Sequence, residues 1–158
     1  MKRLRNITLA TAAALSLAQS GAEAGNRVVV KQSGGGVTEV KQSGSNNKAT
    51  IIQKKNKAQK SADKNSGDSQ IAIIRQEGDN NSVVQEQEGG DNVALVDQTG
   101  EHNSVVQTQQ GRDNLALSIQ EGEDNVIAHT QIGDGHSRTV TQSGSGKNMV
   151  ITQSESKK

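Results

Sequence analysis

Residues 87–109 read QEGGDNVALVDQTGEHNSVVQTQ and contain the unit that decides the fold. Glutamine opens each unit, glycine follows two places later, asparagine follows five places later, and the next glutamine stands at the eleventh place. The glutamine interval continues without a break through residues 76–153. A short, fixed period of this kind is the signature of a repeat architecture rather than of an ordinary globular core.

Three sets of residues recur at this interval, and we expect them to form the structural ladder of the fold. The glutamines are Gln76, Gln87, Gln98, Gln109, Gln120, Gln131, Gln142 and Gln153. The glycines are Gly78, Gly89, Gly100, Gly111, Gly122, Gly133 and Gly144. The asparagines are Asn81, Asn92, Asn103, Asn114 and Asn125.

Each unit predicts one strand and one turn. The residues between Asn and Gln are rich in Val, Ile, Leu and Ala, as in residues 93–96 and 115–119. Short apolar runs bounded by Gly and Asn are typical of strands, and Gly and Asn accept the positive φ that turns require. A glycine in every unit and the lack of helix caps argue against helices.

The true period is twice as long. Residues 81–87 (NSVVQEQ) are nearly repeated by residues 103–109 (NSVVQTQ), two units later, whereas adjacent units differ. This alternation predicts an all-β fold, a two-sheet β-solenoid of strand-turn-strand repeats with about 22 residues per turn and about 11 per half. Alternate glutamines then stack in two columns, one in each sheet. From Asn26 to Gln153 there is room for about six turns, one of them formed by the Lys-rich stretch described below.

Asn and Gln lie six places apart in each unit and therefore share one face of a strand. The opposite face carries Val84 and Leu95 and is no less apolar, so hydrophobicity does not decide which face points inward. Stacked amides can hydrogen-bond to one another along the axis and so offset the cost of burying them. We therefore predict that the Asn/Gln face is inside. His129 and Arg138 fall on this face and disturb the array.

The N-terminus predicts export. Positive residues at positions 2, 3 and 5 precede an apolar run over residues 7–18 and an Ala-Glu-Ala cleavage site at residues 22–24. This arrangement indicates a signal peptide over residues 1–24, with the mature chain beginning at Gly25. The apolar run is too short to span a membrane, and we expect no transmembrane segment.

The mature chain divides into four segments by the quality of its repeats. Degenerate repeats occupy residues 25–53, a Lys-rich polar interruption occupies 54–66, the regular solenoid occupies 67–153, and a polar tail occupies 154–158. Gln70, His136 and Lys147 stand at asparagine positions. The interruption is either an exposed loop that contacts anionic lipopolysaccharide, nucleic acid or another subunit, or a degenerate repeat kept soluble by charge.

Composition excludes several functions. The sequence contains no Phe, Tyr, Trp, Pro or Cys, so neither an aromatic core nor disulfides can stabilise it. A net charge of +1 without interleaved aromatic residues argues against specific nucleic-acid binding. His102, His129 and His136 lack metal-ligand spacing, and no nucleophile motif is present. We therefore expect no enzymatic activity, no cofactor and no metal site.

The repeat resembles a known family. Residues 87–98 and 109–120 both fit Q-x-G-x-x-N-x-A-x-x-x-Q, which is similar to the curlin repeat of bacterial curli fibres, and the resemblance covers about residues 26–153. It implies a subunit that is secreted across the outer membrane and polymerises at the cell surface as a functional amyloid fibre, or fimbrium, supporting biofilm matrix and cell adhesion. The implied partners are further copies of the chain, another curlin subunit, and the outer-membrane secretion channel with its accessory factors.

Three assignments remain open within and beyond this resemblance. Charged residues within strands and the lack of Tyr and Phe are more like the minor, nucleating subunit, and the major curli subunit is the alternative. A monomeric β-solenoid that binds calcium or a surface ligand is an alternative of another class. Calcium-binding solenoid repeats have period nine, and only residues 89–91 resemble them.

Asp91 and Asp113 are candidate gatekeepers of assembly. They occupy the same turn position two units apart, so their carboxylates would lie about one strand spacing from each other. Like charges at that distance repel and would slow assembly or attract a cation. Alternatively, these turns are simply solvated, since Asp is a good turn former.

Overall fold

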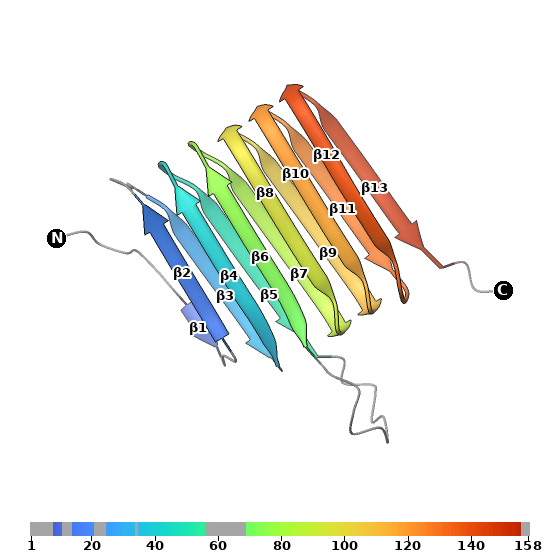
Figure 1. Cartoon of the computed structure of the whole chain (residues 1–158). Helices are drawn as coiled ribbons and strands as arrows, with labels where there is room; N and C mark the ends of the chain where they lie inside the picture. Colours follow the sequence, from blue (N-terminus) through green and yellow to red (C-terminus); the bar gives the residue numbers. More distant parts are fainter. Residues whose placement is uncertain (1–7, 11–13, 21–24, 34, 56–68, 156–158) are drawn as a thin grey trace, which may run out of the picture.

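The computed structural model describes residues 8–10, 14–20, 25–33, 35–55 and 69–155, and side chains from residue 25 onward. Its strands coil into a two-sheet β-solenoid (Figure 1). The seven-stranded sheet has the order β1-β3-β5-β7-β9-β11-β13, and the six-stranded sheet has the order β12-β10-β8-β6-β4-β2. The described residues contain no helix, and therefore none that is long and apolar enough to cross a membrane. The predicted fold class is confirmed.

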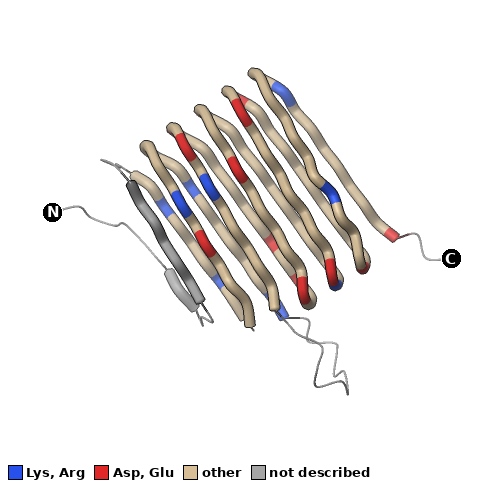
Figure 2. The backbone as a smooth tube through the Cα atoms, viewed as in Figure 1, with Lys and Arg blue, Asp and Glu red and all other residues tan. Residues whose placement is uncertain are grey.

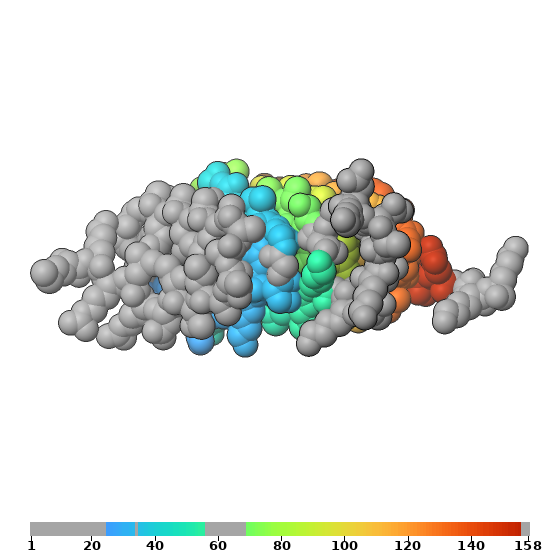
Figure 3. All heavy atoms as spheres, turned by 90° about the horizontal axis from the view of Figure 1, so that it is seen from below, coloured from blue at the N-terminus to red at the C-terminus, as the bar shows by residue number. Residues whose placement is uncertain are grey.

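Strands alternate between the two sheets along the chain. The seven-stranded sheet contains β1 (Thr8–Ala10), β3 (Arg27–Ser33), β5 (Lys48–Lys54), β7 (Ser82–Gly90), β9 (Ser104–Arg112), β11 (Val126–Ile132) and β13 (Asn148–Ser154). The six-stranded sheet contains β2 (Ala14–Ser20), β4 (Gly36–Ser43), β6 (Gln70–Glu77), β8 (Val93–Glu101), β10 (Leu115–Glu123) and β12 (Ser137–Ser145). Seen from below, the coils follow one another in chain order along one axis (Figure 3).

The strand pairings are parallel, and beyond β6 each residue pairs with its copy two units later. Gln87 pairs with Gln109 in one sheet, and Gln98 pairs with Gln120 in the other. The two glutamine columns therefore lie in different sheets, as the alternation predicted. Between β3 and β5 the register is one place shorter, since Gln32 pairs with Gln53. The short early repeat thus loses a residue without losing the alignment of its glutamines.

The Lys-rich stretch does not form a coil of its own, which corrects the expected turn count. Gln42 pairs with Gln76 and Gln53 pairs with Gln87, so successive coils are joined directly across this stretch. Its additional residues are therefore accommodated between β5 and β6, and the strands from β3 to β13 make about five turns. Residues 56–68, which include most of the predicted interruption, lie outside the described part of the chain.

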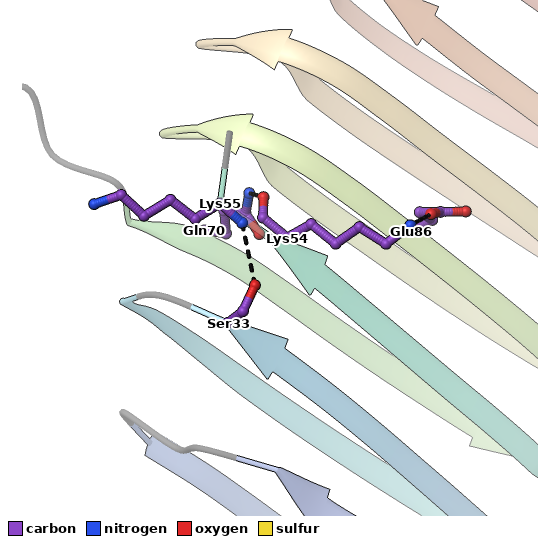
Figure 4. Close-up of polar contacts among 5 residues, drawn as sticks. All are labelled: Ser33, Lys54, Lys55, Gln70 and Glu86. Atoms are coloured by element: carbon purple, nitrogen blue, oxygen red, sulfur yellow. Dashed lines mark hydrogen bonds and ion pairs between the residues drawn. The ribbon is translucent and has the colours of Figure 1, made fainter. Parts of the chain in front are cut away.

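The two ends of this insertion are joined to the sheets (Figure 4). The Lys54 ammonium pairs with the Glu86 carboxylate of the next coil, and this hydrogen bond is the main reason why the pKa of Lys54 is raised. The Lys55 backbone N–H donates to Ser33 Oγ over 3.3 Å, and Gln70 Nε2 donates to the Lys54 carbonyl over 3.0 Å. The strands on both sides thus keep their stacking despite the insertion.

The predicted leader also contributes described strands. β1 pairs with β3, and β2 pairs with β4. The assignment of residues 1–24 as a signal peptide stays a prediction. If this segment is removed, β3 and β4 become the N-terminal edges of the two sheets.

The interior is thin and mostly amide. Among the described residues, 14 buried side chains are hydrophobic and 23 are polar or charged, so hydrogen bonding must satisfy most of the core. The hydrophobic members are small or β-branched, as in Val83, Ala94 and Ile127. All the predicted ladder asparagines, and the ladder glutamines from Gln76 to Gln142, are buried. The prediction that the Asn/Gln face is inside is confirmed.

Charge is separated along the axis (Figure 2). Basic side chains such as Lys31, Lys41 and Lys48 lie on the early coils, in β3, β4 and β5. Acidic side chains such as Glu86 and Glu121 lie on later coils, in β7 and β10. The net charge of +1 therefore hides two regions of opposite sign.

The repeat glycines lie where neighbouring coils approach most closely. Gly100 has a φ of +114°, and a Cβ there would lie 2.0 Å from the carbonyl oxygen of Gly122 in the next coil. A Cβ on Gly78 would lie 2.1 Å from the carbonyl oxygen of Gly100. Glycine is required for two reasons, because side chains rarely adopt this φ and because the space belongs to the backbone of the next coil.

We expect Gly100→Ala to lower the free energy of unfolding by about 3 kcal/mol, since it adds both backbone strain and overpacking. The matched control is Gly146→Ala, because Gly146 also has positive φ (+67°) but has no described atom within 4 Å of an added Cβ. The control should cost about 1 kcal/mol. Urea unfolding of freshly prepared monomer measures both. Equal losses in the two variants would show that close coil contact is not the reason for glycine.

Candidate functional site: the amide ladders and the strand edges

The buried glutamines form two continuous hydrogen-bonded ladders. In the six-stranded sheet, Gln42 donates to Gln76, Gln76 to Gln98, Gln98 to Gln120 and Gln120 to Gln142, over 2.8–3.1 Å. In the seven-stranded sheet, Gln53 donates to Gln87, Gln87 to Gln109, Gln109 to Gln131 and Gln131 to Gln153, over 2.9–3.0 Å. Every bond joins Nε2 of one coil to Oε1 of the next. The ladders are therefore directional.

The asparagines join each turn to the following coil. Asn81 Nδ2 donates to the Gly100 carbonyl over 2.8 Å, and Asn81 Oδ1 accepts the backbone N–H of Asn103 over 3.0 Å. Asn92 makes the equivalent bonds to Gly111 and Asn114 in the other column. Each asparagine thus satisfies backbone groups that the turn leaves unpaired, while its own amide is buried.

The substitutes at asparagine positions preserve part of this arrangement. Gln70 Nε2 reaches the Gly89 carbonyl over 2.8 Å, which is the bond that asparagine makes elsewhere. A His136 ring nitrogen lies 3.0 Å from the Ile132 carbonyl, and Lys147 Nζ donates to the Ser143 carbonyl. Both of these contacts go to the residue four places earlier, as asparagine does in intact units. The assignment of these three residues to the asparagine position agrees with their contacts.

The ladder extends further than the regular repeat. Gln42, Gln53 and Asn47 from the degenerate segment belong to it, as their hydrogen bonds show. Gln85 and Gln107 form a second interior pair, in which Gln85 Nε2 donates to Gln107 Oε1 over 3.0 Å. The sequence placed this pair on the inner face but gave no reason to single it out, because only two coils carry it.

The residue before each asparagine adopts the left-handed conformation. Among the described residues, six that are not glycine have φ between 53° and 59°, namely Asn46, Asn80, Asp91, His102, Asp113 and Asp124. Asn, Asp and His are the side chains that tolerate this conformation best. The turn geometry by itself explains why Asp stands at positions 91 and 113.

Asp91 and Asp113 lie at equivalent places in successive turns, because the preceding residues Gly90 and Arg112 are paired. Both side chains are exposed, and the Asp113 backbone N–H donates to the Gly90 carbonyl over 3.2 Å. The gatekeeper role of these two carboxylates stays a prediction. Within the described ranges, no three His, Asp or Glu residues come together in a way that could hold a metal ion.

His129 breaks the interior pattern. It pairs in register with Gln107 of β9, it is 1% exposed, and neither ring nitrogen has a hydrogen-bond partner among the described residues. Burial lowers the pKa of this imidazole, and the Arg138 charge lowers it further. Both effects favour the neutral form of the His129 imidazole in the folded chain.

The two ends of the solenoid differ in what they leave unpaired. Near the N-terminal end, the buried Oε1 atoms of Gln42 and Gln53 and both amide atoms of Gln32 lack partners among the described residues. At the other end, Gln142 and Gln153 accept a bond at Oε1 but have no further described coil to which Nε2 can donate. In the described part of the two ladders, the first glutamine therefore leaves an acceptor unpaired and the last leaves a donor, whereas Gln32 leaves both kinds of atom unpaired.

The backbone edge at the C-terminal end is open as well. Outward-facing residues donate their N–H toward the following coil, as Ser104 does to the Asn125 carbonyl and Val126 does to the Lys147 carbonyl, both over 2.8 Å. The same positions of β13 include Val150 and Thr152, and β13 has no further strand beside it in the described part of the chain. Their N–H groups therefore point to an open edge, which is a template for another strand.

Comparison of this chain with models of protein families, with curated proteins and with solved structures finds no match.

We expect Gln98→Leu to lower the free energy of unfolding by about 3 kcal/mol, because it leaves Gln120 Oε1 without its donor and removes one of the two acceptors of Gln76 Nε2, the other being the Lys48 carbonyl. Gln110→Leu is the control, since Gln110 lies exposed on the outer face of β9. Urea unfolding of the monomer should show little change for the control. A Gln98→Leu variant as stable as the control would show that the ladder contributes little.

We expect the free energy of unfolding to decrease as pH is lowered, because His129 is buried. Its pKa in the folded chain lies below the unfolded value of about 6.5, so the unfolded chain binds more protons as pH falls. The contribution of the neutral His129 imidazole to the free energy of unfolding is fully present above about pH 6.5. It declines below that pH, and the decline ends once pH is lower than the pKa of His129 in the folded chain. Thermal unfolding between about pH 7.5 and about pH 5 measures this slope.

His129→Gln should reduce the slope, because glutamine remains uncharged and can accept the ladder bond from Gln107. His102→Gln is the matched control, since His102 is exposed in a turn. If both variants keep the same pH dependence as the unmodified chain, His129 is not its source.

Proposed function

We propose that this chain is a secreted structural subunit of curli-type extracellular amyloid fibres, which supports biofilm matrix and cell adhesion. The observation that carries the proposal is the polarity of the solenoid. Among the described residues, the first glutamine of each ladder leaves Oε1 unpaired, and the last has no described coil to which Nε2 can donate. Once the predicted leader is removed, both ends are open edges of parallel sheets with the same strand spacing. One copy can therefore stack on another in the way that each coil stacks on the next.

Energetics favour such stacking over a free edge. An unpaired amide in a dry interior costs about 1–3 kcal/mol, and each added copy would satisfy several at once. The sequence contains no Pro, and proline is one of the devices by which proteins block a strand edge. Removal of the predicted leader would supply the N-terminal edge at β3 and β4.

Within the curli assignment, we propose the minor, nucleating subunit, with the major subunit as the alternative. The outer face of β7 carries Glu86 and Glu88, and that of β8 carries Asp97, so charge lies inside the strands. No aromatic side chain is available for stacking between coils. The proposed partners are further copies of this chain, another curlin subunit, and the secretion channel with its accessory factors.

The test is to incubate purified residues 25–158 alone and to follow amyloid dye binding and fibre diffraction. We expect fibres with cross-β spacings of about 4.7 and about 10 Å. A nucleator should assemble with little lag and should seed a major curlin added separately, whereas a long lag with a high fibre yield indicates the major subunit. A chain that stays monomeric for days at high concentration contradicts the proposal and favours a self-contained binding module.

A double variant tests the joint between copies. Val150→Pro with Thr152→Pro removes two N–H donors that point to the open edge, while the bonds from β13 to β11 remain, so the chain should fold but not elongate from this end. Val150→Thr with Thr152→Val keeps the donors and serves as the control. Circular dichroism checks the fold of both variants. Fibre growth of the proline variant at the unmodified rate would exclude the β13 edge as the joint.

A further inference from the structure

The outer face of the six-stranded sheet carries a block of apolar side chains that the interior does not use. The register stacks these residues in adjacent rows across β4, β6, β8 and β10. The block, called the apolar face below, consists of two rows that contain Val37, Ile71, Val93 and Leu115 in one and Ile73, Leu95 and Leu117 in the other. Glu39 stands at the β4 end of the second row. Val37 is 48% and Leu115 is 41% exposed, and the other members are partly exposed. Contiguous apolar patches of this kind mark interaction sites.

The opposite side of the solenoid shows that strand formation does not require such a face. In the seven-stranded sheet, one of the two corresponding rows contains Lys48, Ser82 and Ser104 before Val126. The other row is mostly apolar and contains Val84, Val106 and Ala128. Both sheets contribute the same kind of inward-facing side chains to the interior, and both have the same register between coils. The apolar residues of the six-stranded sheet thus serve something outside the coil.

A second copy of the same face is the occupant that its charges favour. Arg75 and Asp97 are register partners in the row beside the apolar rows. A two-fold axis parallel to the strands and midway between β6 and β8 exchanges these strands. It places Arg75 of each copy opposite Asp97 of the other, and Ile73 opposite Leu95. Val37 then meets Leu115 across the pair. Glu39 and Lys41 of β4 are ion-paired with each other over 2.7 Å and lie over Leu117 and Ile119 of the second copy.

A membrane fits this face less well. Asp97 lies in the row directly beside the apolar rows, and Glu77 and Glu121 lie one row further out. An anionic lipid surface would repel these carboxylates. The flat arrangement of parallel rows suits another sheet, since sheets pack face to face at about 10 Å.

The area of the face determines when the contact forms. Four strands at about 4.8 Å and two rows, which occupy about 13 Å along the strands, cover about 250 Å² per chain. Stable complexes bury about 800 Å² on each partner, so one pair of chains is too small to associate firmly. In a fibre the face recurs in every copy, and three stacked copies already come close to the required area.

We propose that the apolar face joins two stacks of this chain laterally, face to face and running in opposite directions. This inference rests on the proposed polymerisation, and it adds that the fibre unit is a pair of solenoids. The stacks run in opposite directions because the two-fold axis is perpendicular to the solenoid axis.

The test is the mass per unit length of fibres, measured by dark-field scanning transmission electron microscopy. Unmodified fibres should have twice the mass per length of a single solenoid. Leu95→Lys places a charge in the centre of the apolar face and should halve this value while dye-detected elongation continues. Val106→Lys is the matched control, because Val106 occupies the same row on the outer face of β9 and is 43% exposed. It should leave the doubled value unchanged.

Charge exchange tests the orientation of the pair. Arg75→Glu alone should halve the mass per length, since it places like charges opposite each other, and Arg75→Glu combined with Asp97→Arg should restore it. Unmodified fibres with the mass of one solenoid overturn the lateral pair but leave the polymer intact, whereas the absence of any fibre overturns the proposed function. Binding to phosphatidylcholine–phosphatidylglycerol vesicles that Leu95→Lys abolishes, without any change in mass per length, overturns the second copy as occupant.

Discussion

The stacking of each repeat position on its copy in the next coil is the constraint on which the rest of the structure depends. Amides can be buried here only because each one meets its copy in the neighbouring coil, at a distance suited to a hydrogen bond. The glycines obey the same constraint, because the carbonyl of the next coil occupies the space of their Cβ. A register shift by a single place would move every amide to the outer face.

The same constraint gives the molecule a direction. Each ladder bond runs from Nε2 of one coil to Oε1 of the next. The first glutamine of a ladder therefore lacks a described donor for its Oε1, and the last lacks a described acceptor for its Nε2. In most globular proteins the buried polar groups find hydrogen-bond partners within the chain. In this fold, the amide groups of the terminal coils need partners that lie beyond those coils. The polarity of a single coil thus becomes the polarity of the whole chain, and it underlies the proposed growth by stacking.

The two outer faces are free of this constraint and have diverged. The interior needs the same Asn, Gln and Gly positions in both sheets, but the side chains that point away from it have no such requirement. One sheet shows Ser, Thr and Glu beside a single apolar row, and the other shows Ile, Leu and Val in two rows. Differences between otherwise equivalent surfaces are informative about partners, because the fold itself does not demand them.

Much of the fold could be predicted from the sequence, because the repeat indicates both the secondary structure of each unit and which units lie beside each other. The glutamine interval gave the strands and turns, the resemblance of residues 81–87 to 103–109 gave the two sheets, and the chemistry of amides gave the inner face. The equivalence of Gln70 to an asparagine could also be seen, since its position in the period remained intact after the Lys-rich stretch.

Tertiary structure decided what the period does not encode. The Lys-rich stretch adds no coil, because β4 and β6 pair directly across it. The sequence does not show whether this pairing is more stable than an additional coil. The unpartnered His129 and the interior Gln85–Gln107 pair depend on which side chains meet across coils. The apolar face likewise appears only when residues from different coils are aligned. The sequence by itself determined the coil, since a repeat fixes how each unit meets its copy, whereas only the folded chain determined how the irregular residues and outer surfaces come together.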